Sequence, residues 1–172
     1  LLSKRHGAFS ISEYRKSDYL PEALLNYMIL LGWAPRNKKE KFKIDDIIET
    51  FDIGTMSKAS SVFDQQKLDW LSGQYIREAD LERLTNLAIP YVQAAGFISA
   101  DENKIDRAHL SLIVDAVRNN MSCMSQIVQE ADIFFKDPVV SEKHVEFLSS
   151  EISQSVLLSF YRELQKLDTL SP

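Results

Sequence analysis

Apolar residues recur at helical spacing along most of the chain, and this periodicity constrains the fold more than any other feature. Leu110, Ile113 and Val117, for example, are three and four residues apart, as on one face of an α-helix. Alternating β-branched runs between turn pairs do not occur, and the 172 residues include only five glycines and five prolines. The sequence therefore predicts an all-α fold.

Local signals place several helices in the first half of the chain. A helix is expected from Pro21, which suits a first turn, to Gly32, which suits an end. Its apolar face is expected to consist of Leu24, Tyr27, Met28 and Leu31. Asp64 is expected to cap a later helix that buries Leu68 and Leu71. The aromatic side chains of this half are expected in the core: Tyr19, Tyr27, Trp33, Phe63 and Trp70.

From about residue 78 the pattern becomes a series of amphipathic helices. Pro90 is expected to kink or interrupt the first of them, and Gly96 to end it. A helix over residues 106–118 should follow. Two later helices are expected to bury these side chains: Ile127, Ala131 and Phe134 within residues 122–135, and Ile152, Val156, Phe160, Leu164 and Leu167 within residues 151–167.

Composition excludes several kinds of site. Cys123 is the single cysteine and the three histidines are scattered, so we expect no disulfide, no metal site and no Cys–His nucleophile pair. The longest apolar run, residues 28–31, is too short to cross a membrane. A reducing, cytoplasm-like compartment is expected. The chain starts without methionine or a leader pattern, which indicates a piece excised from a longer protein.

Charge is distributed unevenly along the chain. Residues 1–43 carry nine basic and four acidic side chains, whereas the remaining 129 residues have a net charge of −10. Such asymmetry favours an anion-binding surface on an acidic body. A solvated linker explains the same basic residues equally well.

A series of motifs occurs in a fixed order. Ser3-Lys4-Arg5-His6-Gly7 is followed by Tyr19-Leu20-Pro21-Glu22-Ala23-Leu24-Leu25-Asn26-Tyr27, Gly32-Trp33, Phe63-Asp64, Lys67-Leu68-Asp69-Trp70-Leu71 and Tyr75-Ile76-Arg77. Together these motifs resemble the C-terminal portion of a bacterial or organellar glutamyl-tRNA synthetase, a class I aminoacyl-tRNA synthetase. The resemblance implies a signature loop and a helical stem-contact subdomain in residues 1–77. It also implies a helical anticodon-binding domain in residues 78–172, incomplete at its C-terminal end.

The family attaches glutamate to tRNA(Glu) with the use of ATP. The resemblance implies that Ser3, Lys4 and Arg5 bind ATP and that Lys4 is catalytic, since an ammonium group can stabilise charge developing on phosphoryl oxygens. Leu1 stands where the family usually has the first lysine of the loop. The catalytic domain is expected to precede residue 1. We therefore expect this piece to hold no cofactor and to be inactive alone, while the whole protein uses ATP with Mg.

The resemblance also implies contacts with tRNA. Candidates for phosphate contacts are the basic residues Arg15, Lys16, Arg36, Lys38, Lys39, Lys41 and Lys43. Ser72 stands where relatives commonly have asparagine. Asn120 stands where relatives place an arginine that reads the anticodon, and Arg118 is the reader if the register shifts. Hence tRNA(Gln) is a possible partner besides tRNA(Glu). The resemblance further implies a monomer in the cytoplasm or an organellar matrix.

The sequence leaves one alternative class of function open and excludes another. An all-α protein-interaction module with a basic linker is the alternative, and it predicts salt-insensitive binding to a protein without tRNA affinity. An independent phosphate-transfer enzyme is excluded, because no second catalytic group accompanies Lys4.

Overall fold

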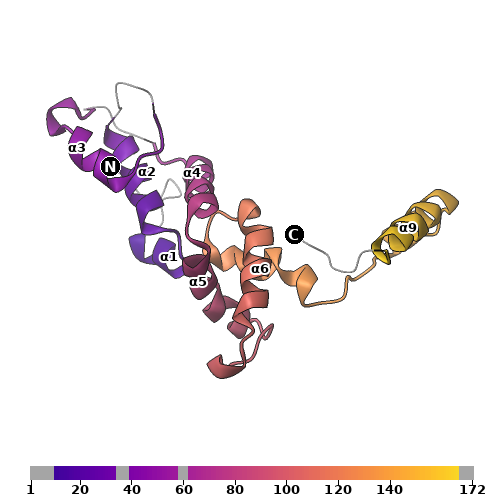
Figure 1. Cartoon of the computed structure of the whole chain (residues 1–172). Coiled ribbons are helices and arrows are strands. Elements are labelled where there is room, and N and C mark those ends of the chain that lie inside the picture. The colour runs from indigo at the N-terminus through magenta and orange to yellow at the C-terminus, as the bar shows by residue number, and fades with distance from the viewer. Residues whose placement is uncertain (1–9, 34–38, 58–61, 167–172) are drawn as a thin grey trace. The chain divides into compact units, whose positions relative to one another are not determined.

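The structure is a computed structural model that describes residues 10–33, 39–57 and 62–166. The chain forms two compact units, Leu1–Asp132 and Ile133–Pro172. The described residues form helices, turns and one isolated antiparallel bridge, between Trp33 and Met56, with no named strand (Figure 1). This confirms the predicted all-α fold. No helix in the described ranges is long and apolar enough to cross a membrane.

The described part of the first unit contains seven α-helices, the last of them a single turn, and several 3₁₀ turns. In chain order these are α1 (Ile11–Lys16), α2 (Pro21–Gly32), α3 (Ile44–Thr50), η2 (Ile53–Thr55), α4 (Gln65–Glu78), α5 (Leu81–Ala94), η3 (Glu102–Lys104), α6 (Arg107–Val117), η4 (Arg118–Asn120), η5 (Met124–Gln126) and α7 (Ile127–Glu130). A further turn, η6 (Asp132–Phe134), follows at the boundary with the second unit.

The core of the first half lies between α2 and α4. Asp64 caps α4 by accepting a hydrogen bond from the Lys67 amide at 3.1 Å, and Leu68 and Leu71 are completely buried, as predicted. The Tyr27 hydroxyl accepts from the Asp64 amide at 2.7 Å and donates to the Asp64 carbonyl at 2.8 Å. The start of α4 is therefore joined to α2 by both apolar packing and hydrogen bonds.

Two predictions about this core are wrong. Met28, which was predicted to be buried, is half exposed. Asn26, which was not part of the predicted apolar face, is fully buried. Trp70 is not in the core, since 49% of its surface is exposed. The buried face of a helix depends on where the neighbouring elements lie. Periodicity alone therefore assigned part of the buried face of α2 to the wrong residues.

The second half of the first unit packs α5 against α6 and α7. Pro90 lies inside α5, which continues to Ala94, and Gly96 follows with a φ of +74°. Pro90 therefore does not interrupt the helix. Asp106 caps α6, and the three predicted core residues, Leu110, Ile113 and Val117, are buried. Gly96 suits its position because a left-handed φ is costly for residues with a Cβ.

The predicted helix over residues 122–135 is wrong. Cys123 is extended, and the following backbone forms η5, the single turn α7 and η6. The amides of Met124 and Ser125 each donate, at 3.3 Å, to the carbonyls of Asp18 and Ser17. These tertiary hydrogen bonds replace helical ones, and Phe134 is consequently 47% exposed instead of buried.

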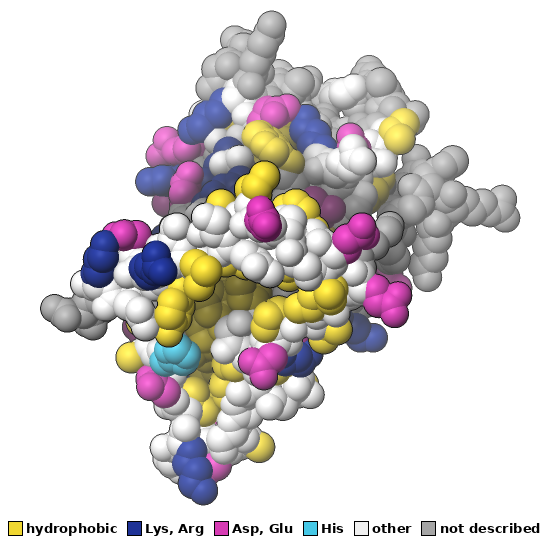
Figure 2. Space-filling view, turned by 90° about the vertical axis from the view of Figure 1, so that its right-hand side faces the viewer, with side chains coloured by type: hydrophobic (Ala, Val, Ile, Leu, Met, Phe, Trp, Pro, Cys, Tyr) yellow, Lys and Arg dark blue, Asp and Glu magenta, His cyan; other side chains and the backbone are white. Residues whose placement is uncertain are grey.

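The second unit contains α8 (Glu142–Leu148) and α9 (Glu151–Leu164). The last helix exists as predicted, but its stripe is not buried in the described residues: Ile152, Val156 and Phe160 are each more than 60% exposed. Hydrophobic side chains are visible at the molecular surface in Figure 2. The apolar periodicity correctly predicted a helix and wrongly predicted its burial.

Candidate nucleic-acid interface

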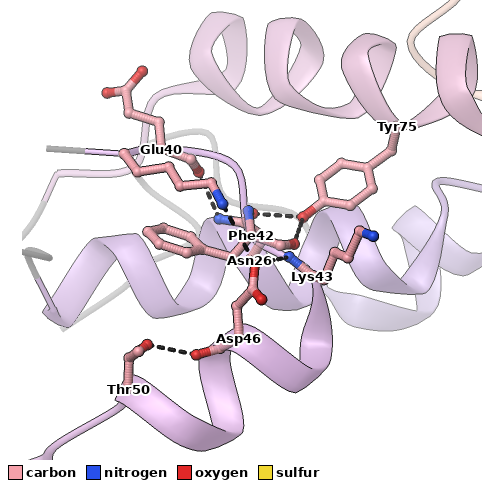
Figure 3. Close-up of polar contacts among 8 residues, drawn as sticks. Asn26, Glu40, Phe42, Lys43, Asp46, Thr50 and Tyr75 are labelled. Atoms are coloured by element: carbon pink, nitrogen blue, oxygen red, sulfur yellow. Dashed lines mark hydrogen bonds and ion pairs between the residues drawn. The ribbon is translucent and has the colours of Figure 1, made fainter. Parts of the chain in front are cut away.

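A buried asparagine on α2 fixes the shape of the lysine-rich segment 39–43. The Asn26 Nδ2 donates to the Glu40 carbonyl at 2.8 Å, and its Oδ1 accepts from the Phe42 amide at 2.8 Å (Figure 3). The Tyr75 hydroxyl of α4 lies 2.5 Å from both Asn26 Oδ1 and the Phe42 carbonyl. The Asn26 side chain thus hydrogen-bonds to the backbone of the segment, as the backbone of a paired β-strand would. The Phe42 side chain packs inward against Trp33.

Burial of this network affects the protonation of Tyr75. Removal of the phenol from water raises the pKa of Tyr75 to about 12, since burial disfavours its charged form. The hydroxyl therefore remains a proton donor at all ordinary pH values. It has one proton, so it can donate to only one of its two neighbouring oxygens at a time.

Lys41 is the most enclosed of the described lysines in this segment. Its Nζ donates to the Gln74 carbonyl at 2.9 Å, pairs with Glu78 at 2.7 Å and lies 4.9 Å from the centre of the Tyr75 ring. The hydrogen bond from Lys41 holds the pKa of Glu78 below its ordinary value. Lys41 therefore anchors the segment to the end of α4, in addition to carrying a positive charge at the surface.

Lys39 and Lys43 are more exposed. Lys39 pairs with Asp46 at 3.3 Å and lies over the Phe42 ring at 5.5 Å. Lys43 immediately precedes α3, and its backbone amide donates to the Asp46 carboxylate at 3.4 Å. The three lysines line one surface hollow of about 480 Å³, together with Glu22, Phe42, Asp46, Tyr75, Glu78 and Ala79. The structure therefore brings three of the predicted phosphate-contact residues together.

The other predicted contact residues lie elsewhere. Arg15 and Lys16 are exposed in the last turn of α1 and line two hollows different from that of the lysines. Arg36 and Lys38 lie outside the described residues, as do Ser3, Lys4 and Arg5 of the signature loop. Their positions stay predictions.

The two candidate anticodon readers lie in the turn η4 after α6. Arg118 pairs with Asp115 at 2.9 Å, and 27% of its side chain is exposed. Asn120 is exposed. Arg77 of α4 donates to the Asn119 carbonyl at 3.2 Å, which attaches η4 to α4. Ser72 is buried, and its hydroxyl donates to the Ser122 carbonyl at 2.6 Å. This hydrogen bond attaches the backbone just after η4 to α4.

Sequence reasoning missed Asn26, although a signal was present. Asn26 is the single polar side chain in the apolar run Ala23-Leu24-Leu25-Asn26-Tyr27-Met28. A polar residue in an apolar helix is stable only when its hydrogen bonds are satisfied, and no buried side-chain nitrogen or oxygen in the described ranges lacks a partner.

Comparison with known proteins adds to this geometry. A family model described as an anticodon binding domain matches residues 83–172, and one described as the catalytic domain of class I tRNA synthetases (E and Q) matches residues 1–70. The chain is 46% identical over 138 residues to the glutamate–tRNA ligase of Desulforamulus reducens, covering 80% of this chain and 29% of that protein. The chain belongs to the glutamate–tRNA ligase family.

The chain is similar to other members of the glutamate–tRNA ligase family as well. The ligase of Heliobacterium modesticaldum is 37% identical over 173 residues, covering 99% of this chain and 35% of that protein. A crystal structure of a glutamate tRNA ligase from Elizabethkingia meningosepticum is similar in fold, with a TM-score of 0.75 and 24% identity over 97% of this chain and 36% of that one. The chain spans about a third of the length of these ligases.

Proposed function

We propose that this chain is a tRNA-binding part of a bacterial or organellar type of glutamate–tRNA ligase, and that the whole protein attaches glutamate to tRNA(Glu) with ATP and Mg. The family match supports this proposal, since the relatives carry the name glutamate–tRNA ligase. A monomer in the cytoplasm or an organellar matrix is part of the same proposal.

The observation that carries RNA binding is the hollow lined by Lys39, Lys41 and Lys43. Lysine ammonium groups are point charges that suit phosphate oxygens, and release of counterions from the RNA favours binding. Two of the lysines pair with surface carboxylates, Asp46 and Glu78. Exposed pairs of this kind contribute little stability, so a phosphate can replace the carboxylate at small cost.

The proposal also covers ATP binding by the signature loop and contact with the anticodon. Lys4, with Ser3 and Arg5, is proposed to stabilise the charge that develops on ATP during formation of the aminoacyl-adenylate. We further propose that Mg binds together with ATP in the whole protein. Around η4, Asn120 or Arg118 is proposed to contact the anticodon. Use of tRNA(Gln) follows if Asn120 stands at the reading position.

A salt titration tests RNA binding. Filter binding of the 172-residue chain to a tRNA transcript is expected to be micromolar or weaker and to decline steeply as salt rises. Lys39→Ala and Lys43→Ala should each lower the slope of log affinity against log salt by about one. Lys104→Ala is the matched control, because Lys104 is also an exposed lysine paired with a carboxylate, Asp101. Binding that is equal at low and high salt would contradict the phosphate contacts, and salt-insensitive binding to a protein would favour the interaction module.

A further inference from the structure

α4 presents Trp70 to solvent in a register that the buried side of the helix fixes. Leu68, Leu71, Ser72 and Ile76 are fully buried. Because successive helical residues are separated by about 100°, these four positions force Trp70 onto the opposite face. Its exposure is therefore a property of a firmly packed helix and does not result from a loose end.

The two tryptophans of the chain differ in their surroundings. Trp33 is buried, and its indole N–H donates to the Thr55 hydroxyl at 2.9 Å. Trp70 is 49% exposed, and within the described ranges its indole N–H has no hydrogen-bond partner. A single exposed apolar side chain is common at protein surfaces and does not by itself indicate a binding site. The residues around Trp70 are therefore the evidence for what it binds.

A guanidinium lies on the same face. Arg77 is seven residues after Trp70, which places it two turns and about 10 Å along the same stripe. Gly73 lies between them, and a Cβ there would be 3.3 Å from the Met121 carbonyl and 3.4 Å from Arg77 Nη1. The missing side chain lets the guanidinium lie against the helix, where Nη1 donates to the Asn119 carbonyl. No acidic side chain of the described residues pairs with Arg77.

In the described residues, the other charged side chains near this stripe have partners of their own, and none of the carboxylates neutralises Arg77. Lys67 pairs with Glu40 at 2.6 Å and Lys41 pairs with Glu78 at 2.7 Å, so the nearby carboxylates are each matched by a lysine. Asp69, the other acid of α4, accepts instead from Tyr19 at 2.6 Å on the helix side that faces α1 and α2. Trp70 is thus flanked by Gln66, Lys67, Gln74 and Arg77.

We propose that Trp70 stacks on an unpaired nucleotide of the bound RNA while Arg77 contacts a neighbouring phosphate. An aromatic face accepts any base, and a guanidinium with unused donors suits a phosphate about two turns away. The stripe also joins the two candidate regions, because Lys41 bonds to Gln74 at one edge and Arg77 bonds to η4 at its end. This inference rests on the proposed RNA binding and adds a contact that depends on stacking rather than on charge.

Tryptophan fluorescence and affinity test the contact with the full 172-residue chain. A tRNA transcript, a short single-stranded RNA and a blunt duplex of the same length serve as probes. The tRNA and the single strand are expected to quench the fluorescence, and the duplex less. Trp70→Leu should weaken tRNA binding roughly 5- to 150-fold with an unchanged salt slope, while Trp70→Phe stays within a few-fold of the unmodified chain. Arg77→Gln should lower the salt slope by about one.

Matched controls separate stacking from general surface effects. Leu112→Ala removes another exposed apolar side chain, 54% exposed on α6, and Arg107→Gln removes another surface arginine, which bonds to Asn86. Both should leave affinity unchanged, and circular dichroism checks that each variant folds. Salt-dependent tRNA binding that Trp70→Leu leaves unchanged overturns the stacking contact while the proposed function survives. No tRNA binding by the unmodified chain overturns both.

Discussion

The Tyr75 hydroxyl lies 2.5 Å from Oδ1 of Asn26, although the two residues are 49 positions apart in sequence. This contact joins α4 to α2 and completes the bonds by which Asn26 holds the backbone of Glu40 and Phe42. The lysines of residues 39–43 owe their placement to this buried network, which contains no charged side chain.

Asn26→Ala should destabilise the chain by about 2–4 kcal/mol. The substitution leaves the Phe42 amide and the Glu40 carbonyl without their partner, and each unsatisfied buried group is costly, whereas the Tyr75 hydroxyl keeps the Phe42 carbonyl. Urea unfolding measures the loss. Asn103→Ala, at an exposed position, is the control and should change stability by less than about 0.5 kcal/mol. Equal stability of the two variants would mean that the network does not hold the segment.

Lys41→Met should reduce both stability and RNA affinity, whereas Lys43→Ala should reduce affinity alone. Lys41 bonds to the Gln74 carbonyl and Glu78, and its loss should cost about 1 kcal/mol, while Lys43 is exposed. Thermal unfolding and filter binding of both variants distinguish these effects. If Lys41→Met unfolds at the same temperature as the unmodified chain, its contacts are not structural.

Stability should fall as the pH rises from about 10 to 12. Burial raises the pKa of Tyr75 to about 12 from the ordinary value of 10, so in this window the unfolded chain loses a proton that the folded chain keeps. The stabilising effect is complete below pH 10 and is lost as pH approaches 12. Burial also raises the pKa values of Tyr19 and Tyr91. Melting temperatures of Tyr75→Phe should fall less steeply across this range, and an identical profile would contradict the assignment.

Asn120→Arg in the whole ligase should narrow tRNA use towards tRNA(Glu). Asparagine is shorter and uncharged, so a base discrimination worth about 1–3 kcal/mol is expected to be missing in the unmodified protein. Steady-state aminoacylation of tRNA(Glu) and tRNA(Gln) measures this. An unmodified preference above about a hundredfold, roughly 2.7 kcal/mol, would mean that another residue already reads the base.

The 172-residue chain should show no glutamate-dependent exchange of pyrophosphate into ATP. Lys4 is the one catalytic candidate in its sequence, and a lone lysine lacks the groups that bind and activate glutamate. In the whole ligase, Lys4→Ala should lower the adenylation rate more than the affinity for ATP, since its charge acts mainly in the transition state. Measurable exchange by the 172-residue chain alone would refute the prediction that adenylation requires other parts of the ligase.

The sequence by itself determined where several helices begin or end. Asp64 and Asp106 cap the helices that follow them, Pro21 begins α2 and Gly96 ends α5, because these effects act within a few residues. The buried faces of α4 and α6 were also predictable. Their apolar residues are numerous and regularly spaced, so one packing face is clearly preferred.

The tertiary structure decided which polar and aromatic side chains have partners. Asn26 and Lys41 lie on a helix and a segment whose local pattern does not reveal what packs beside them, since their partners are 14 to 49 positions away. The break at Cys123 has the same cause, because the carbonyls of Ser17 and Asp18 accept the amides that a helix would have used. Local propensity is a weak force compared with satisfied hydrogen bonds and buried apolar surface, and these depend on contacts between residues far apart in the chain.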